Sequence, residues 1–114
     1  MVTPYCPQRG DVVWLSFSPS VGHEQARRRP ALVLSASAYN EKVGLCICCP
    51  ITSKQKGYPF EVVLGPDVPV QGVVLADQVR SLDWRERSAQ YIGRVSSAVL
   101  HDVIEKIRIL LESQ

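Results

Sequence analysis

Residues 30–50, PALVLSASAYNEKVGLCICCP, decide the fold, because two short apolar stretches flank a polar segment there. The stretches 30–35 and 44–50 are almost wholly apolar, which is typical of strands buried on both faces. The polar residues 39–42 between them predict a turn. Because consecutive strands usually pair, residues 30–50 predict two neighbouring strands of one sheet.

Further strands are expected on both sides of this pair. Segment 12–17 follows the turn signal Arg9-Gly10-Asp11, and the segments 58–64, 70–75 and 91–95 are rich in strand-forming residues. Segment 77–83 is expected to form a short helix or turn. A C-terminal helix capped by Ser96 or Ser97 is predicted from apolar residues at three- and four-residue intervals. These are Val99, Leu100, Val103, Ile104, Ile107, Leu110 and Leu111.

Several short strands with one terminal helix predict a mainly β fold with helices (α+β). We expect a small, strongly bent antiparallel barrel that is closed or plugged by helix. A length of 114 residues predicts one domain spanning residues 1–114, and 46% hydrophobic residues exclude a disordered chain. No apolar run approaches the roughly 20 residues of a membrane span, and residues 1–4 lack a secretory signal. We therefore expect a cytoplasmic protein without a membrane span.

The four cysteines do not form a zinc motif. Cys46, Cys48 and Cys49 lie within four residues of one expected strand, and Cys6 is far upstream. Zinc ligands need spacings that let a turn or loop wrap around the ion. We expect reduced, buried thiols and no cofactor or metal.

Positive charge is concentrated in the first half of the chain. Residues 1–57 hold seven basic and three acidic side chains, although the whole chain carries only +2. Residues 22–30, GHEQARRRP, contribute three consecutive arginines, and guanidiniums bind phosphate oxygens through paired N–H donors. Glu24 and His23 are candidates for proton transfer. The alternative is a solvated, charged loop without a chemical role.

A phosphate site would extend to the end of the strand that begins near residue 44. Thr52 would lie beside the arginine loop if the two central strands pair, and its hydroxyl can bind a phosphate oxygen. Lys54 and Lys56 add electrostatic attraction for phosphates. Tyr58 is a candidate for stacking on a base, whereas Trp14 and Phe60 lie in apolar strand patterns that favour core packing.

Several blocks of sequence together resemble one known family. They are RGDVVW (9–14), GHEQ (22–25), RPALVLS (29–35), CPIT (49–52), KGYPFEV (56–62) and GVVLADQVRS (72–81). In this order and spacing the chain closely resembles, over nearly its whole length, the MazF (PemK/Kid-like) toxins of bacterial toxin–antitoxin systems.

The resemblance implies a specific activity and fold. Toxins of this kind are mRNA interferases, which are ribosome-independent endoribonucleases that cut single-stranded RNA at short sequences and stop translation and growth. It implies an SH3-like or CcdB/PemK-type barrel that works as a homodimer with RNA along the dimer interface. It also implies metal-independent attack of the RNA 2′-hydroxyl on the adjacent phosphate, leaving 2′,3′-cyclic phosphate and 5′-hydroxyl ends.

The resemblance also implies roles for individual residues. Arg29 would stabilise the phosphate in the transition state, Thr52 would hold a phosphate oxygen, and Glu24 would act as a base or organiser. His23 and Arg28 stand where this chain departs from the family pattern. The residues implied in RNA positioning are Gln25, Arg27, Arg28, Ser53, Lys54, Lys56, Gln78 and Arg80, although Gln78 and Asp77 have a structural alternative in the turn after residue 75.

The implied partner is a MazE-like antitoxin with a disordered acidic tail that folds over the basic groove. Operator DNA would be contacted only through the toxin–antitoxin complex. Two other functions are weighed against the nuclease: a non-catalytic CcdB-like toxin that inhibits DNA gyrase by binding, and a plain RNA-binding module. A binder protects RNA and a nuclease cuts it, so turnover separates them. The joint presence of Arg29, Thr52 and Glu24 favours the nuclease.

Overall fold

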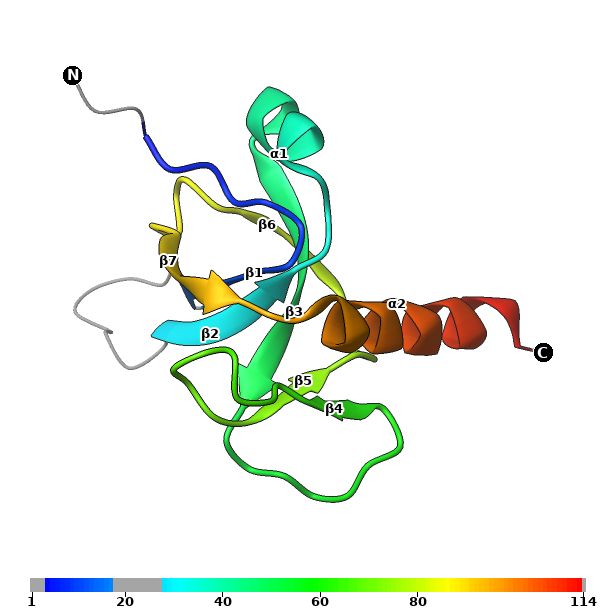
Figure 1. Ribbon diagram of the computed structural model, residues 1–114. Coiled ribbons are helices and arrows are strands. Elements are labelled where there is room, and N and C mark those ends of the chain that lie inside the picture. The colour runs from blue at the N-terminus through cyan, green and yellow to red at the C-terminus, as the bar shows by residue number, and fades with distance from the viewer. Residues whose placement is uncertain (1–3, 18–27, 114) are drawn as a thin grey trace.

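The computed structural model describes residues 4–17 and 28–113, which form seven strands and two helices (Figure 1). In chain order they are β1 (Asp11–Ser16), β2 (Arg28–Val33), α1 (Ser37–Val43), β3 (Leu45–Thr52), β4 (Glu61–Val63), β5 (Val73–Leu75), β6 (Arg80–Asp83), β7 (Gln90–Arg94) and α2 (Ser97–Glu112). The predicted α+β class and the C-terminal helix are confirmed. Neither helix within the described ranges is long and apolar enough to cross a membrane.

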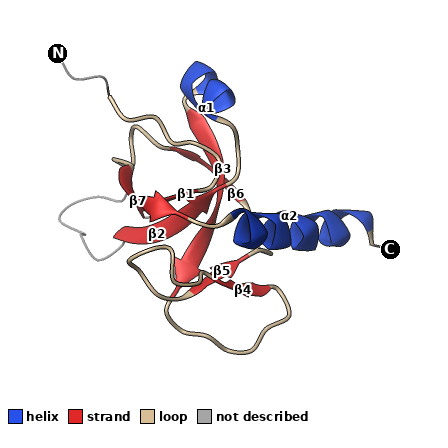
Figure 2. Ribbon diagram, viewed as in Figure 1, coloured by secondary structure: helices blue, strands red, loops and turns tan. Residues whose placement is uncertain are grey.

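All strand pairs are antiparallel, and β3 is the strand that bends the sheet. The strands follow the order β4-β5-β3-β2-β1-β7, and β6 also pairs with β3. The first half of β3 pairs with β6, its last two residues pair with β5, and β2 lies along its other edge (Figure 2). Over the described residues this path runs from β4 to β7 without joining its ends, so the bent sheet is an open barrel rather than a closed one.

Because β1, β2 and β3 alternate their side chains between two apolar clusters, these strands are buried on both faces, as expected for β2 and β3. The first cluster includes Val12, Leu32 and Cys49 and packs against α2 through the fully buried Val103. The second cluster includes Val13, Ala31 and Cys48 on the opposite face. The helix α2 begins at the predicted cap: the Ser96 Oγ accepts a hydrogen bond from the Val99 backbone N–H at 3.2 Å.

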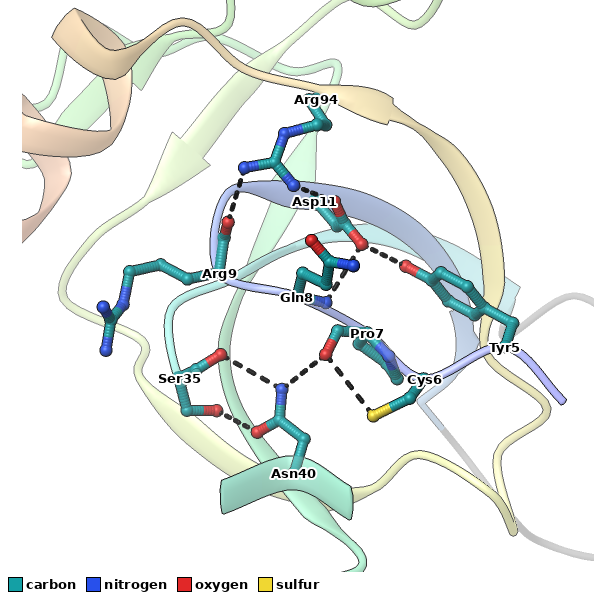
Figure 3. A network of polar contacts seen from close by, with 9 residues as sticks. All are labelled: Tyr5, Cys6, Pro7, Gln8, Arg9, Asp11, Ser35, Asn40 and Arg94. Carbon is teal, nitrogen blue, oxygen red and sulfur yellow. Dashed lines mark hydrogen bonds and ion pairs between the residues drawn. The ribbon is translucent and has the colours of Figure 1, made fainter. Parts of the chain in front are cut away.

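The expected turn at residues 39–42 is instead the short helix α1. It ends at Gly44, whose φ of +85° is a left-handed conformation that glycine adopts without strain. The buried side chain of Asn40 holds the helix in place, since its Nδ2 donates to the carbonyls of Pro7 at 2.8 Å and Ser35 at 3.0 Å (Figure 3). Tertiary hydrogen bonds therefore stabilise a helix that lacks an apolar period. Segment 77–83, for which a helix or turn was expected, ends in strand β6.

We expect Asn40→Ala to lower the free energy of unfolding by about 3 kcal/mol or more. The substitution leaves two buried carbonyls and the Ser35 hydroxyl without their partner, and each such group costs about 1–3 kcal/mol. Urea denaturation followed by circular dichroism measures the effect. The exposed neighbour Glu41 provides the control, because Glu41→Ala should change stability by less than about 0.5 kcal/mol. A loss below about 1 kcal/mol for Asn40→Ala would contradict this account.

The N-terminal segment is tied to β7 through the buried carboxylate of Asp11. This carboxylate accepts hydrogen bonds from the Tyr5 hydroxyl and the Gln8 backbone N–H, and it pairs with the Arg94 guanidinium at 2.7 Å (Figure 3). Burial raises the pKa of Tyr5, and the hydrogen bond to Asp11 raises it further. The phenol therefore remains protonated at physiological pH and continues to donate its hydrogen bond to Asp11.

Candidate active site

Arg29 at the start of β2 and Thr52 at the end of β3 come together at one edge of the sheet. The two strands pair with Ala31 opposite Pro50 and Leu32 opposite Cys49. The same register, continued by two residues, puts Arg29 opposite Thr52. Both side chains line one surface groove, so two residues 23 positions apart in the sequence meet in the fold, as the sequence predicted.

The groove consists of two adjoining pockets that share three residues. The first has a volume of about 320 Å³ and the second about 590 Å³, and Arg29, Thr52 and Lys54 line both. The first pocket is completed by Lys56, Tyr58, Glu61, Leu75, Asp77 and Gln78. The second is completed by Trp14, Pro30, Ile51, Ser53, Val70 and Gln71. The shared residues therefore lie at the junction of the two pockets. An extended ligand would place one chemical group at this junction and one neighbouring group in each pocket.

The first pocket combines cationic and anionic side chains. Arg29, Lys54 and Lys56 contribute positive charge, and Glu61 and Asp77 contribute negative charge. The Glu61 carboxylate also shapes the loop before β4, because it accepts the backbone N–H groups of Lys56 at 3.0 Å and of Gly57 at 3.0 Å. The cations of the pocket can therefore bind an anion, and its carboxylates can accept hydrogen bonds.

The Thr52 hydroxyl is oriented by the chain that follows it. Its Oγ1 accepts a hydrogen bond from the Lys54 backbone N–H at 3.1 Å, so its own hydrogen can be donated to a ligand. Gly72, with φ of +143°, packs directly against the Thr52 carbonyl, and a side chain there would overlap that oxygen. The lack of a side chain at residue 72 thus allows β5 to lie against the end of β3 that carries Thr52.

The second pocket is lined by one aromatic residue together with polar and aliphatic residues. Trp14 of β1 is half-buried, pairs with Pro30 across the strands and belongs to neither apolar cluster. The core packing expected for Trp14 is therefore wrong, because its ring forms part of a groove wall. Phe60 does pack against the first apolar cluster, as expected. Gln71, from the loop before β5, adds an amide that no sequence motif indicated.

Six of the predicted site residues line the groove: Arg29, Thr52, Ser53, Lys54, Lys56 and Gln78. Glu24, Gln25 and Arg27, together with His23, lie outside the described residues. Arg28 and Arg80 do not line either pocket. The Arg28 guanidinium donates to protein acceptors, and that of Arg80 lies over the Phe17 ring at 5.5 Å. Glu61 is a carboxylate that was not among the predicted site residues, although it lies within the quoted block 56–62.

The cysteines stand apart from this chemistry. All four are free thiols, with Cys46, Cys48 and Cys49 buried in β3. Burial raises the pKa of Cys49 to about 12, and the charge of Asp77 contributes, so this thiol stays protonated. Across residues 4–17 and 28–113, no cluster of three or more His, Cys, Asp or Glu is arranged to hold a metal ion.

The family model and two similar curated proteins indicate the same family. The model of the PemK-like, MazF-like toxin of type II toxin–antitoxin systems matches residues 8–111. The endoribonuclease toxin MazF of Escherichia coli (strain K12) is 49% identical over 111 residues, covering 97% of this chain and 99% of that protein. The endoribonuclease toxin ChpB of the same strain is 38% identical over 92% of this chain and 94% of that protein.

Solved structures agree with the sequence comparison. The crystal structure of MazF from Deinococcus radiodurans has a TM-score of 0.86 and 54% identity, covering 95% of this chain and 98% of that one. A MazE–MazF structure from the same organism has a TM-score of 0.86 and 48% identity, covering 97% of this chain and 100% of that one.

Proposed function

The chain belongs to the PemK-like, MazF-like family of type II toxin–antitoxin toxins, and from this premise we propose that it is an endoribonuclease toxin whose active site is the groove at Arg29 and Thr52. Relatives with 49% and 38% identity are endoribonucleases. The observation that carries the location of the site is the convergence of Arg29, Thr52 and Lys54 at the junction of two pockets. We place the scissile phosphate at this junction, with one flanking nucleotide in each pocket.

The proposed reaction uses the RNA's own 2′-hydroxyl as the nucleophile. The 2′ oxygen forms a bond to phosphorus while the bond from phosphorus to the 5′ oxygen breaks, which leaves a 2′,3′-cyclic phosphate and a 5′-hydroxyl. The proton of the 2′-hydroxyl passes to a base, for which Glu24 is the candidate, and the 5′ oxygen takes a proton from water in the open groove. We propose that this reaction requires no metal ion.

Arg29 and Thr52 act on the charge that develops on the phosphate. The phosphorus becomes pentacoordinate and its oxygens gain negative charge, which the Arg29 guanidinium stabilises through paired N–H donors. The Thr52 hydroxyl donates to one of these oxygens, and the hydrogen bond from the Lys54 N–H fixes its orientation. Since a guanidinium is a poor acid, the role of Arg29 is electrostatic rather than proton donation.

The remaining groove residues bind the RNA around the cut. Lys54 and Lys56 attract phosphates irrespective of sequence, whereas Gln78 and Ser53 carry donors and acceptors suited to base edges or sugars. The exposed ring of Tyr58 and the half-buried Trp14 offer stacking surfaces for the two flanking bases. Gln25 and Arg27 remain candidates from the segment that is not described.

The same proposal includes partners and location. One of the similar solved structures, from Deinococcus radiodurans, contains MazF together with MazE. A MazE-like antitoxin is therefore the expected partner of this chain. An acidic antitoxin segment would compete with RNA for the Arg29, Lys54 and Lys56 end of the groove. We further propose that the toxin works as a homodimer in the cytoplasm, where mRNA is translated, and contacts operator DNA only within the antitoxin complex.

Incubation of the purified protein with a long single-stranded RNA in EDTA tests this proposal. We expect discrete cuts at a recurring short word, with cyclic phosphate and 5′-hydroxyl ends, and no cutting of DNA of the same sequence, which lacks the 2′-hydroxyl. RNA that is bound but stays intact would favour the binding module. A folded, antitoxin-free protein that leaves RNA intact but inhibits DNA gyrase would favour the CcdB-like function. Cleavage that EDTA abolishes would contradict the metal-independent reaction alone.

A further inference from the structure

The side chain of Arg28 is fastened to the turn between β6 and β7. Its Nη2 donates to the Ser88 carbonyl at 2.7 Å and to the Gln90 Oε1 at 3.1 Å. Its Nη1 donates to the Arg87 carbonyl at 3.3 Å and to the Ser16 Oγ at 3.3 Å. Both terminal nitrogens of the guanidinium are thus directed at the protein, and each meets two acceptors.

Arg87 completes the connection from the opposite direction. Its Nη1 donates to the carbonyls of Ser16 and Phe17, each at 2.9 Å. Its own carbonyl accepts from the Ser16 backbone N–H at 3.1 Å as well as from Arg28. We call this set the arginine clamp: the side chains of Arg28 and Arg87 together with the backbone of residues 16–17 and 87–88.

The arginine clamp contacts the end of β1 and the start of β2, and these two strand ends set the position of Arg29. Ser16 is the last residue of β1 and Arg28 the first of β2, and they are paired, as are Leu15 and Arg29. Because neighbouring side chains of a strand point to opposite faces, Arg28 reaches the turn while Arg29 reaches the groove. A shift of the β2 end would therefore move Arg29 relative to Thr52.

The turn between β6 and β7 directs the carbonyls of Arg87 and Ser88 toward the Arg28 guanidinium. Ser88 has φ of +53°, a left-handed conformation that costs free energy in a residue other than glycine. The guanidinium holds the carbonyl of this residue, and its planar set of donors reaches four acceptors at once. A lysine ammonium is a compact point charge with three donors and cannot reproduce that geometry.

We propose that Arg28 is a positioning residue that acts through Arg29, rather than a contact to RNA, and that the arginine clamp holds β2 in the register that catalysis needs. The inference rests on the proposed function, since it assigns Arg29 to the reacting phosphate. A displacement of about 1 Å can slow an enzymatic step about 10²-fold, so loosening the clamp should act mainly on kcat.

Four variants test the clamp: Arg28→Gln, Arg28→Lys, Arg87→Gln and, as the matched control, Arg85→Gln. Arg85 belongs to the same turn, but its guanidinium lies over the Trp84 ring at 4.6 Å instead of reaching β1 or β2. Steady-state kcat and KM are measured on an RNA oligonucleotide that contains a mapped cut site. Binding is measured on the same oligonucleotide with a 2′-deoxynucleotide at the cut, over a range of salt concentrations. Circular dichroism and thermal unfolding establish that each variant is folded.

We expect Arg28→Gln and Arg87→Gln to lower kcat about tenfold or more with KM changed by less than about twofold. A fifth variant, which combines Arg28→Gln with Arg87→Gln, should be little worse than either single variant, because the two residues form one unit. Arg28→Lys should fail to restore kcat although it keeps the charge. The logarithmic salt slope of binding should stay as in the wild type, whereas loss of one phosphate contact would reduce it by about 0.7. Arg85→Gln should match the wild type throughout.

Two results would overturn the inference while leaving the nuclease intact. One is a reduced salt slope with weaker RNA binding in Arg28→Gln that Arg28→Lys restores, which identifies an RNA contact. The other is an unchanged kcat in folded Arg28→Gln and Arg87→Gln. A wild-type protein that does not cut RNA contradicts the proposed function and this inference together, so the wild-type assay separates the two failures.

Discussion

Replacing Arg29 by alanine is expected to lower the rate of RNA cleavage by about a thousandfold or more. An arginine that stabilises the charge of a phosphoryl transition state contributes about 10³–10⁵ to kcat. Arg29 is the guanidinium that lines both pockets of the groove, so no neighbouring arginine among the described residues that line it can replace its paired donors. Single-turnover cleavage of a mapped RNA site measures the loss directly.

The folded state should survive this substitution, because the Arg29 side chain is exposed. Its melting temperature should stay within a few degrees of the wild type, and the circular dichroism spectrum should be unchanged. Arg29→Lys is the matched variant: it retains the positive charge and loses the planar fork, so its rate should lie between those of the alanine variant and the wild type. Near-native cleavage by Arg29→Ala would contradict the assignment of the active site to the groove at Arg29.

The central strands β1, β2 and β3 could be predicted from the sequence because their signal is local, whereas β6, in a segment expected as a helix or turn, could not. In β1, β2 and β3 the apolar residues are short runs of strand formers, and burial on both faces follows from them. Helix α1 could not be predicted in this way. Asn40 favours a turn in isolation, and only the carbonyls of Pro7 and Ser35, brought near by folding, stabilise it within a helix. The fold overrides local propensity at that point.

The candidate site shows the same division between local and tertiary information. Arg29 and Thr52 were identified from sequence blocks, and the pairing of β2 with β3 brings them together as expected. The orientation of Arg28 could not be predicted, because three of its four acceptors lie about 60 residues away, in the turn before β7 and at the first residue of β7. Gln71 lines the groove beside Gly72, whose lack of a side chain allows β5 to approach the Thr52 carbonyl.

Thr52→Val is expected to lower kcat about 10²-fold while RNA binding changes by less than about twofold. The substitution keeps the shape of the side chain and removes the one donor that Thr52 offers to a phosphate oxygen. Loss of a single donor to a developing oxyanion costs about 10²–10³ in rate, because its hydrogen bond strengthens as charge builds up. The ground-state phosphate still meets Arg29 and Lys54, which also line the junction, so affinity should be nearly unaffected.

Thr52→Ser is the control that isolates the hydroxyl from the fold. Serine can still accept the Lys54 N–H and donate to the phosphate, so its rate should stay within about tenfold of the wild type. If valine and serine variants lose the same amount of activity, the methyl group and its packing matter, and the hydroxyl has no catalytic role. Valine could instead weaken binding of the 2′-deoxy oligonucleotide as much as it slows cleavage. In that case Thr52 stabilises the bound RNA and the transition state equally, so it contributes to affinity and not to the rate of the chemical step. Only a loss of kcat confined to valine is consistent with a hydroxyl that acts on the charge formed during the reaction.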